Sequence, residues 1–146
     1  MITTWLPAEN ILIVDSVSNW KQAITLSAQP LLAKGAITED YINAIFHSHH
    51  ELGPYYILAP GLALPHARPE QGAFKNGLSL LHIKQGVSFN TEENDPIYVV
   101  IMLCAVSGDE HISMITALAD IFSDDERLSA LLNASSMGKI QAIIKG

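Results

Sequence analysis

The segment with the clearest chemical potential is LALPHARPEQGA, residues 62–73, which sets His66 between two prolines and two residues before Arg68. Proline fixes its own φ and biases the preceding residue toward extended backbone, so Pro65 and Pro69 stiffen the chain that presents the imidazole. Near neutral pH an imidazole is largely unprotonated and can attack an electrophilic centre without a separate base. This rigid histidine beside a guanidinium predicts transfer of an anionic group, with His66 as the nucleophile.

A second histidine is placed where it could help to hold such an anion. Ser107 and Glu110 match the S-x-x-E capping box of a helix start, and His111 follows in the first turn. Free backbone N–H groups and the positive end of the helix dipole favour an anion there. We expect His111 to stabilise the transferred group; the ordinary alternative is a surface histidine. Asp109 and Glu110 would oppose an anion, so we expect them to point away.

Three segments together resemble a known family. They are LALPHARPEQGA, FNTEENDPI (residues 89–97) and GDEHISMITALADIF (residues 108–122). They are similar to the enzyme IIA (EIIA) proteins of the bacterial phosphoenolpyruvate-dependent sugar phosphotransferase system (PTS), in the mannitol/fructose-type superfamily and within it the ascorbate-type proteins. The resemblance implies a phosphoprotein in which His66 accepts a phosphoryl group from the phosphocarrier protein HPr. It further implies that His66 passes the group to the IIB component of a membrane permease. The system would serve sugar transport, with L-ascorbate as the transported compound.

The resemblance also bears on the neighbours of the active histidine, since it implies that His111 lies beside it. Many relatives carry an arginine in an R-E-x-L segment upstream, but this chain has HHEL at residues 49–52. We expect Arg68, or one of His49 and His50, to replace that arginine. A guanidinium suits bidentate contact with phosphate, which favours Arg68. The ordinary alternative for Arg68 is a solvated loop arginine.

Two other functions stay open from the sequence. A IIA-like protein phosphorylated on the same histidine can regulate a kinase, a channel or a transcription factor instead of serving transport. A metal-dependent hydrolase could use His47 and His50, which lie three residues apart on an expected helix. A catalytic zinc normally needs three protein ligands, however, and no H-E-x-x-H or Cys/His pattern completes the set. No nucleotide-binding glycine motif is present either, so we expect no metal and no cofactor.

The composition indicates one folded domain over residues 1–146, because this length suits one hydrophobic core but not two. Hydrophobic residues make up 49% and charged residues 16%, which excludes a disordered chain. The formal net charge is −7 with only 8 Lys and Arg residues, which argues against a nucleic-acid partner.

The single cysteine, Cys104, lies in an apolar run and is expected to be a buried structural thiol. The absence of a disulfide framework fits a reducing cytoplasm. That apolar run is too short to cross a membrane, and the first residues lack the features of a signal peptide, so we expect a cytoplasmic protein. His82 alternates with Leu78 and Leu80, which predicts a satisfied, partly buried histidine on a strand.

Alternating strand-like and helix-like segments predict an α/β fold, with a mixed β-sheet flanked by helices on both faces. The run 97–106 is apolar on both faces and is expected to be central in the sheet. Pro30 conflicts with the first long helix, so we expect a kink or a restart near Gln29. We expect strands over residues 11–14, 55–58, 62–64, 78–84 and 97–106, and helices over residues 19–34, 38–53, 107–122, 124–132 and 136–144.

Partner docking is expected to use an apolar patch around the active histidine, formed by Leu62, Leu64 and Ala67. Asn76 and Ser79 are further candidates for lining the site, since they lie at the start of an expected strand.

Overall fold

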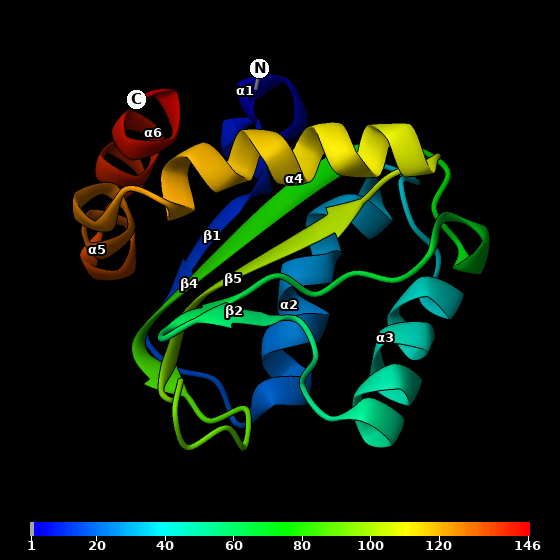
Figure 1. The fold of residues 1–146 in the computed structure, drawn as a ribbon, viewed down its shortest axis with the longest axis horizontal. Helices are drawn as coiled ribbons and strands as arrows, with labels where there is room; N and C mark the ends of the chain where they lie inside the picture. Colours follow the sequence, from blue (N-terminus) through cyan, green and yellow to red (C-terminus); the bar gives the residue numbers. More distant parts are fainter. Residues whose placement is uncertain (1) are drawn as a thin grey trace.

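The strands predicted from the sequence form one mixed sheet. In the computed structural model, which describes residues 2–146, they are β1 (Ile11–Val14), β2 (Ile57–Ala59), β3 (Leu62–Ala63), β4 (Gly77–Val87) and β5 (Ile97–Cys104). Their order across the sheet is β1-β4-β5-β3-β2 (Figure 1). β1 runs parallel to β4 and β3 runs parallel to β5, whereas β4 with β5 and β2 with β3 are antiparallel.

β5 is the central strand, as its apolar run predicts. Its side chains alternate between the two faces of the sheet, as strand geometry requires. Both faces are covered, so each side chain enters one of two separate hydrophobic clusters. Val100, Met102 and Cys104 belong to the first cluster, and Val99, Ile101 and Leu103 belong to the second.

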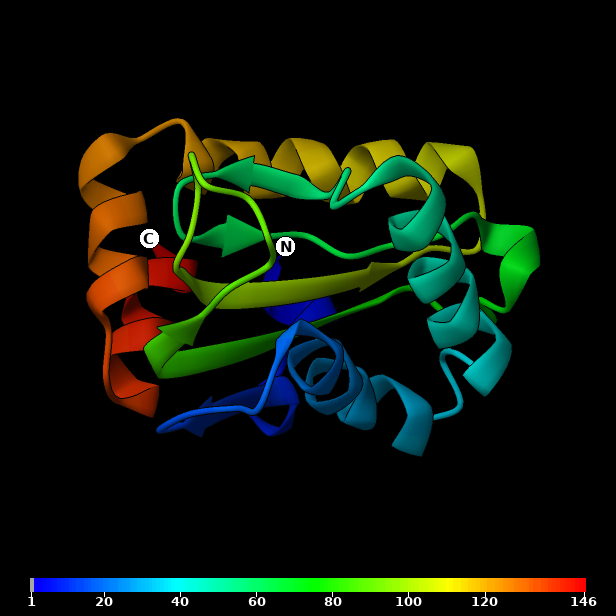
Figure 2. The same ribbon diagram turned by 90° about the horizontal axis from the view of Figure 1, so that it is seen from below.

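Helices cover both faces of the sheet, which confirms the expected α/β architecture (Figures 1 and 2). α2 (Trp20–Ala33) and α3 (Glu39–Leu52) contribute to the first cluster. The second cluster is completed by α4 (Gly108–Phe122), α5 (Asp125–Asn133) and α6 (Met137–Lys145), with the short α1 (Ile2–Trp5) packed against it. Within residues 2–146, no helix is long and apolar enough to cross a membrane.

The long helices begin where the sequence predicts. The Asn19 side chain accepts a hydrogen bond from the backbone N–H of Gln22 at the start of α2. α2 then runs unbroken through Pro30, so the expected restart near Gln29 is wrong. Pro30 lies in the last turn of the helix, where its missing N–H costs a single backbone bond. The helix still closes beyond it, because Lys34 N–H donates to the Pro30 carbonyl at 3.3 Å.

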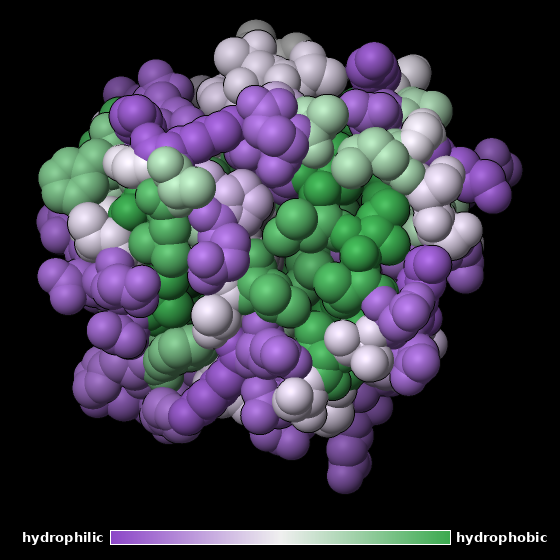
Figure 3. Space-filling model, turned by 180° about the vertical axis from the view of Figure 1, so that it is seen from behind, coloured by the Kyte–Doolittle hydropathy of each residue, from purple (hydrophilic) through white to green (hydrophobic). Residues whose placement is uncertain are grey.

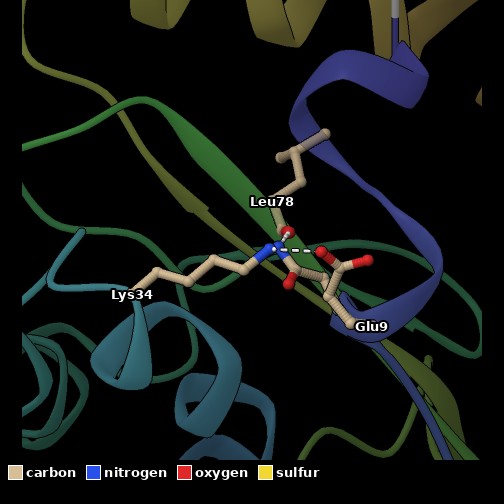
Figure 4. Close-up of polar contacts among 4 residues, drawn as sticks. Glu9, Lys34 and Leu78 are labelled. Atoms are coloured by element: carbon tan, nitrogen blue, oxygen red, sulfur yellow. Dashed lines mark hydrogen bonds and ion pairs between the residues drawn. The ribbon is translucent and has the colours of Figure 1, made fainter.

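Polar contacts fix the chain just before β1 (Figure 4). A turn of 3-10 helix, Ala8–Asn10, precedes the strand. The buried Asn10 amide donates to the carbonyl of Leu78 at 2.9 Å, and Lys34 Nζ lies 3.2 Å from a Glu9 carboxylate oxygen. These contacts hold the entry to β1 against β4 and against the end of α2.

β1 lies at one edge of the sheet, on the side away from β2 (Figure 2). Viewed from behind, where this edge faces the reader, apolar side chains gather among polar ones (Figure 3). Leu12 and Val14 of β1, and Val17 just after it, are partly buried and pack on the first cluster. This edge is remote from β3, after which the predicted nucleophile follows.

The single thiol is part of the core. Cys104 is fully buried at the end of β5, and its Sγ donates to the carbonyls of Lys75 and Gly77. Burial raises the pKa of the Cys104 thiol to about 12. The structure therefore agrees with the expectation of a buried structural cysteine.

Candidate functional site

His66 lies in an extended loop that continues the direction of β3. The Pro65 carbonyl accepts a hydrogen bond from Leu103 N–H at 3.1 Å, and Leu64 N–H donates to the carbonyl of Tyr56 at 2.9 Å. The loop is thus held between the end of β5 and the β2 segment, although it is no longer a regular strand. This places His66 beyond the carboxyl end of β3, next to the first turn of α4.

The His66 ring is fixed in one tautomer. Its Nδ1 lies 2.7 Å from the carbonyl oxygen of Leu64. A carbonyl can only accept, so Nδ1 carries the proton and Nε2 keeps a lone pair. Burial lowers the pKa of His66 and the nearby His111 lowers it further, while the bond to Leu64 acts in the opposite direction. The ring is therefore neutral at pH 7, with Nε2 available as a nucleophile.

Two tyrosines hold the backbone on either side of this ring. The fully buried Tyr41 hydroxyl donates to the Leu103 carbonyl at 2.6 Å and accepts from Ala67 N–H at 3.0 Å. The Tyr55 hydroxyl donates to the His66 carbonyl at 2.6 Å. The Tyr55 ring also meets the imidazole edge-on, at 5.9 Å between centroids and 76° between planes.

The ring faces a cavity of about 550 Å³ built from three parts of the chain. α3 supplies one wall, the loop after β3 supplies the floor, and the first turn of α4 supplies the far side. The His66 side chain is half-buried, so it is partly accessible from this space. Its lining residues are Ser48, Leu52, Tyr55, His66, Ala67, Arg68, Pro69, Gln71, Gly108 and His111.

His111 stands beside His66, as the sequence analysis expects. The two ring centroids are 5.2 Å apart and the ring planes are inclined by 60°. The Ser107 side chain accepts from Glu110 N–H, so the predicted cap of α4 is formed. Gly108 and His111 line the cavity, while Asp109 and Glu110 do not. An anion in the cavity would therefore meet the positive end of α4 without facing these two carboxylates.

Arg68 also lines the cavity, but its side chain is largely exposed. Its Nε lies 3.7 Å from a Glu70 carboxylate oxygen, in a pair where both side chains are solvated. Such a pair contributes only about 0 to 1 kcal/mol, so the guanidinium can leave Glu70 for a better anion at little cost. The backbone is more firmly held, since Arg68 N–H donates to the Gln71 side chain at 2.8 Å.

The helix histidines do not enter the cavity. His49 is buried and stacks on Trp20, with centroids 3.7 Å apart and planes inclined by 7°. Its Nδ1 lies 2.6 Å from the Tyr56 hydroxyl, and burial lowers its pKa. His50 meets the same Trp20 edge-on at 5.9 Å. Neither His49 nor His50 lines the cavity, whereas the Arg68 guanidinium does, so the structure favours Arg68 over the two histidines as the replacement for the upstream arginine.

The metal-site alternative finds no geometric support in these histidines. His47 pairs with Glu51 at 3.2 Å on the exposed face of α3, away from the partners of His49 and His50. Among residues 2–146, no three His, Cys, Asp or Glu side chains are grouped so that they could hold a metal ion.

Several expected lining residues lie elsewhere. Leu62 and Leu64 are fully buried, because β3 packs beside the central strand and α4 to α6 cover it, so they form no docking patch. The buried Ser79 hydroxyl donates to the Ser27 carbonyl inside the sheet–helix interface. The Asn76 side chain accepts from Val106 N–H at 2.9 Å and does not line the cavity.

Some residues of the cavity escaped sequence reasoning. Ser48 and Leu52 come from the last turns of α3, and Tyr55 follows that helix by three residues. Tyr55 reaches the active loop only because β2 and β3 form a hairpin. Its position in the sequence carries no local signal of this contact.

His82 is more deeply buried than expected and only half satisfied. Its Nε2 lies 3.1 Å from the Leu132 carbonyl, while Nδ1 is buried and lacks a hydrogen-bond partner within the described residues. His82 borders a second cavity of about 610 Å³ at the other end of the sheet. This cavity is slightly larger than the one at His66, but the free nitrogen of His82 is not open to it.

Comparison with known proteins agrees with this geometry. Residues 4–146 match the family model described as "Phosphoenolpyruvate-dependent sugar phosphotransferase system, EIIA 2". The solution structure of a mannitol-specific cryptic phosphotransferase enzyme IIA from Escherichia coli is 44% identical, covers 99% of both chains and has a TM-score of 0.92. The ascorbate-specific PTS EIIA component of Escherichia coli K12 is 35% identical over 85% of this chain and 82% of its own length.

A second similar structure shows a IIA protein with a partner. It is the complex of enzyme IIA mannitol and phosphorylated enzyme IIB mannitol from Escherichia coli, 27% identical, with a TM-score of 0.80 over 95% of this chain and 96% of that chain. The family match covers nearly the whole of the present chain, and relatives far above chance identity share its fold. The chain therefore belongs to the phosphoenolpyruvate-dependent sugar phosphotransferase system EIIA 2 family, whose members are phosphotransferases.

Proposed function

We propose that His66 carries the phosphoryl group of this IIA component, through its Nε2. The observation that carries the proposal is the Nδ1 contact with the Leu64 carbonyl, which leaves the Nε2 lone pair free in an open cavity. In the accepting step, Nε2 forms a bond to phosphorus as the nitrogen–phosphorus bond of a donor phosphohistidine breaks. The bonding electron pair returns to the donor imidazole, so no metal and no separate base are needed.

Stabilisation of the transferred group is assigned to three donors around the cavity. His111 is the nearest side chain with a ring N–H, the first turn of α4 offers backbone N–H groups, and Arg68 brings a mobile guanidinium. Catalysis then rests on in-line positioning and on donors that are already oriented. Solvated donors on one open side suit a relay, since the group must leave again.

The donor is proposed to be HPr and the acceptor a permease IIB component. The structure of a IIA protein with phosphorylated IIB supports the acceptor. Exposed apolar side chains next to the cavity, Leu52 and Tyr55, together with Ile112 beside His111, replace the buried Leu62 and Leu64 as the proposed docking residues. A net charge of −7 favours partners with a basic face, and such exchange contacts are small and transient. The proposed location is the cytoplasm, consistent with the free thiol of Cys104.

Two compounds are candidates for the transported substrate, L-ascorbate and mannitol. The resemblance of the motifs to ascorbate-type proteins and the 35% identical relative support L-ascorbate. The 44% identity to the mannitol-specific cryptic protein supports mannitol. A IIA component does not touch the sugar, so deletion of the gene followed by growth on each compound as sole carbon source separates them. Loss of growth on one compound alone identifies the system served.

Phosphorylation of the purified protein tests the central proposal. The protein is incubated with phosphoenolpyruvate, enzyme I and HPr, and its intact mass is then measured. An acid-labile adduct of one phosphoryl group is expected on the wild-type protein and none on His66→Ala. A persistent adduct on a correctly folded His66→Ala protein would contradict the assignment.

A further inference from the structure

The Tyr55 hydroxyl makes a contact that the transfer chemistry does not use. Tyr55 follows α3 by three residues, and its hydroxyl reaches across to the carbonyl of His66 at 2.6 Å. Its ring packs edge-on against the imidazole at 5.9 Å. One side chain therefore contacts both the backbone and the ring of the proposed phosphoryl carrier.

Both contacts of Tyr55 restrict the conformation of His66, one at its peptide and the other at its side chain. The ring bonds back to the Leu64 carbonyl, two residues before its own backbone, so the His66 side chain and the Leu64–His66 backbone form a small closed loop. That loop keeps its shape only while the His66 peptide keeps its orientation. The Tyr55 hydroxyl fixes this orientation at the carbonyl, and its ring blocks rotation of the imidazole on one side.

We propose that Tyr55 is a positioning residue, which holds His66 in the single tautomer and orientation that direct Nε2 into the cavity. The inference rests on the proposed phosphoryl-carrier function of His66 and adds a determinant of its reactivity. Burial raises the pKa of the Tyr55 hydroxyl, so it remains a donor throughout the neutral range. Tyr41 holds the other side of the loop through Ala67 and Leu103, and its hydroxyl bonds to neither the ring nor the carbonyl of His66.

The adjacent Tyr56 provides a matched control. Its hydroxyl also takes part in a 2.6 Å hydrogen bond, but the partner is the buried His49 in the core. Tyr56 is fully buried, whereas Tyr55 is 39% exposed. Removing the Tyr56 hydroxyl should therefore cost at least as much stability as removing that of Tyr55. If a lower transfer rate came only from lost stability, it would therefore appear in the Tyr56→Phe protein at least as strongly as in the Tyr55→Phe protein.

The experiment compares Tyr55→Phe and Tyr56→Phe with the wild-type protein in two measurements. The first is the single-turnover rate constant for phosphoryl transfer from phospho-HPr at saturating donor. The second is the pair of imidazole 15N chemical shifts of His66 in the unphosphorylated protein, which report the tautomer. Tyr55→Phe is expected to lower the rate constant about tenfold, the size of one lost hydrogen bond, and to shift the 15N signals toward a tautomer mixture. Tyr56→Phe is expected to leave both near wild type.

Two results would overturn the proposal. One is a Tyr55→Phe rate constant no lower than that of Tyr56→Phe. The other is a lower rate with unchanged 15N shifts, because the hydroxyl would then act on the partner or the phosphoryl group and not on the His66 ring. If the wild-type protein accepts no phosphoryl group, the proposed function fails, but the 15N comparison still decides whether Tyr55 orients the ring.

Discussion

His66 lies beyond one end of the sheet and His82 lies within β4, beside the cavity at the other end, yet the two share most of their local chemistry. Each gives one ring nitrogen to a backbone carbonyl, Leu64 for His66 and Leu132 for His82. Burial lowers the pKa of both rings. They differ in the second nitrogen: Nε2 of His66 faces an open cavity with His111 beside it, whereas Nδ1 of His82 is enclosed and has no hydrogen-bond partner among residues 2–146.

This difference shows that a lowered pKa does not by itself mark a functional histidine. Burial is the largest cause of the lowered pKa of both rings, and it acts on His82 as it does on His66. A nucleophilic nitrogen also needs a lone pair that the incoming group can reach. It further needs hydrogen-bond donors around the position that the new negative charge will occupy. Each prediction below removes or changes one of these requirements.

Exchanging each ring for a glutamine gives the largest expected contrast. His66→Gln should reduce phosphorylation by phospho-HPr to background. His82→Gln should be phosphorylated at the wild-type rate, since its amide can still donate to the Leu132 carbonyl. Rapid-quench measurement with intact-mass detection reads both. Loss of phosphorylation in a folded His82→Gln protein would show that the two ends of the sheet are coupled.

Removing the neighbouring ring comes next in size. His111→Ala should slow transfer to His66 by about a hundredfold while leaving the fold unchanged, since one oriented donor is lost. Asp109→Asn serves as the control in the same helical turn, because Asp109 does not line the cavity. The same rapid-quench assay applies. A normal rate for His111→Ala would remove this residue from the proposed site.

Acid should destabilise the fold, because burial lowers the pKa of three histidine rings in the folded protein. His49, His66 and His82 all have a pKa lowered by burial from the ordinary value of 6.5. The unfolded chain then binds protons that the folded chain does not, so this stability is complete above pH 6.5 and is lost as the pH falls through the lower, folded values. Each ring adds a slope of up to about 1.4 kcal/mol per pH unit to the free energy of unfolding.

Urea denaturation at a series of pH values measures this slope. His82→Gln should flatten it, because one of the three rings no longer takes up a proton on unfolding. An unchanged slope in that variant would mean that His82 binds its proton equally in the folded and unfolded states.

The smallest expected effect is at the rim of the cavity. Arg68→Gln should slow transfer severalfold and change the free energy of unfolding by less than about 1 kcal/mol, since its ion pair with Glu70 is solvated. The Glu70→Gln variant frees the guanidinium and should not slow transfer. Equal rates for Arg68→Gln and the wild-type protein would identify Arg68 as an ordinary loop residue.

The sequence predicted those parts of the site that depend on local patterns. The prolines around His66 mark a stiff loop, and the capping pattern at Ser107 places His111 in the first turn of a helix. The central position of β5 also followed from its apolar run. All of these features lie within a short stretch of chain, where turn, cap and periodicity rules apply.

Apart from the restart expected near Gln29, the failures concern contacts between distant segments. Leu62 and Leu64 flank the active loop in sequence, but the pairing of β3 with β5 buries them. His49 occupies the position expected of an active-site side chain, yet Trp20 of α2 draws it into the core. Tyr55 was not considered, because only the hairpin of β2 and β3 brings it to His66.

The Tyr41 hydroxyl links the loop beyond His66 to the last residues of β5 from inside the core. Any movement that loosened the loop would break hydrogen bonds with no water at hand to replace them, which costs far more than moving a solvated lid. The loop around His66 therefore keeps a fixed shape when a partner protein docks. Any conformational adjustment that docking requires must occur in the partner.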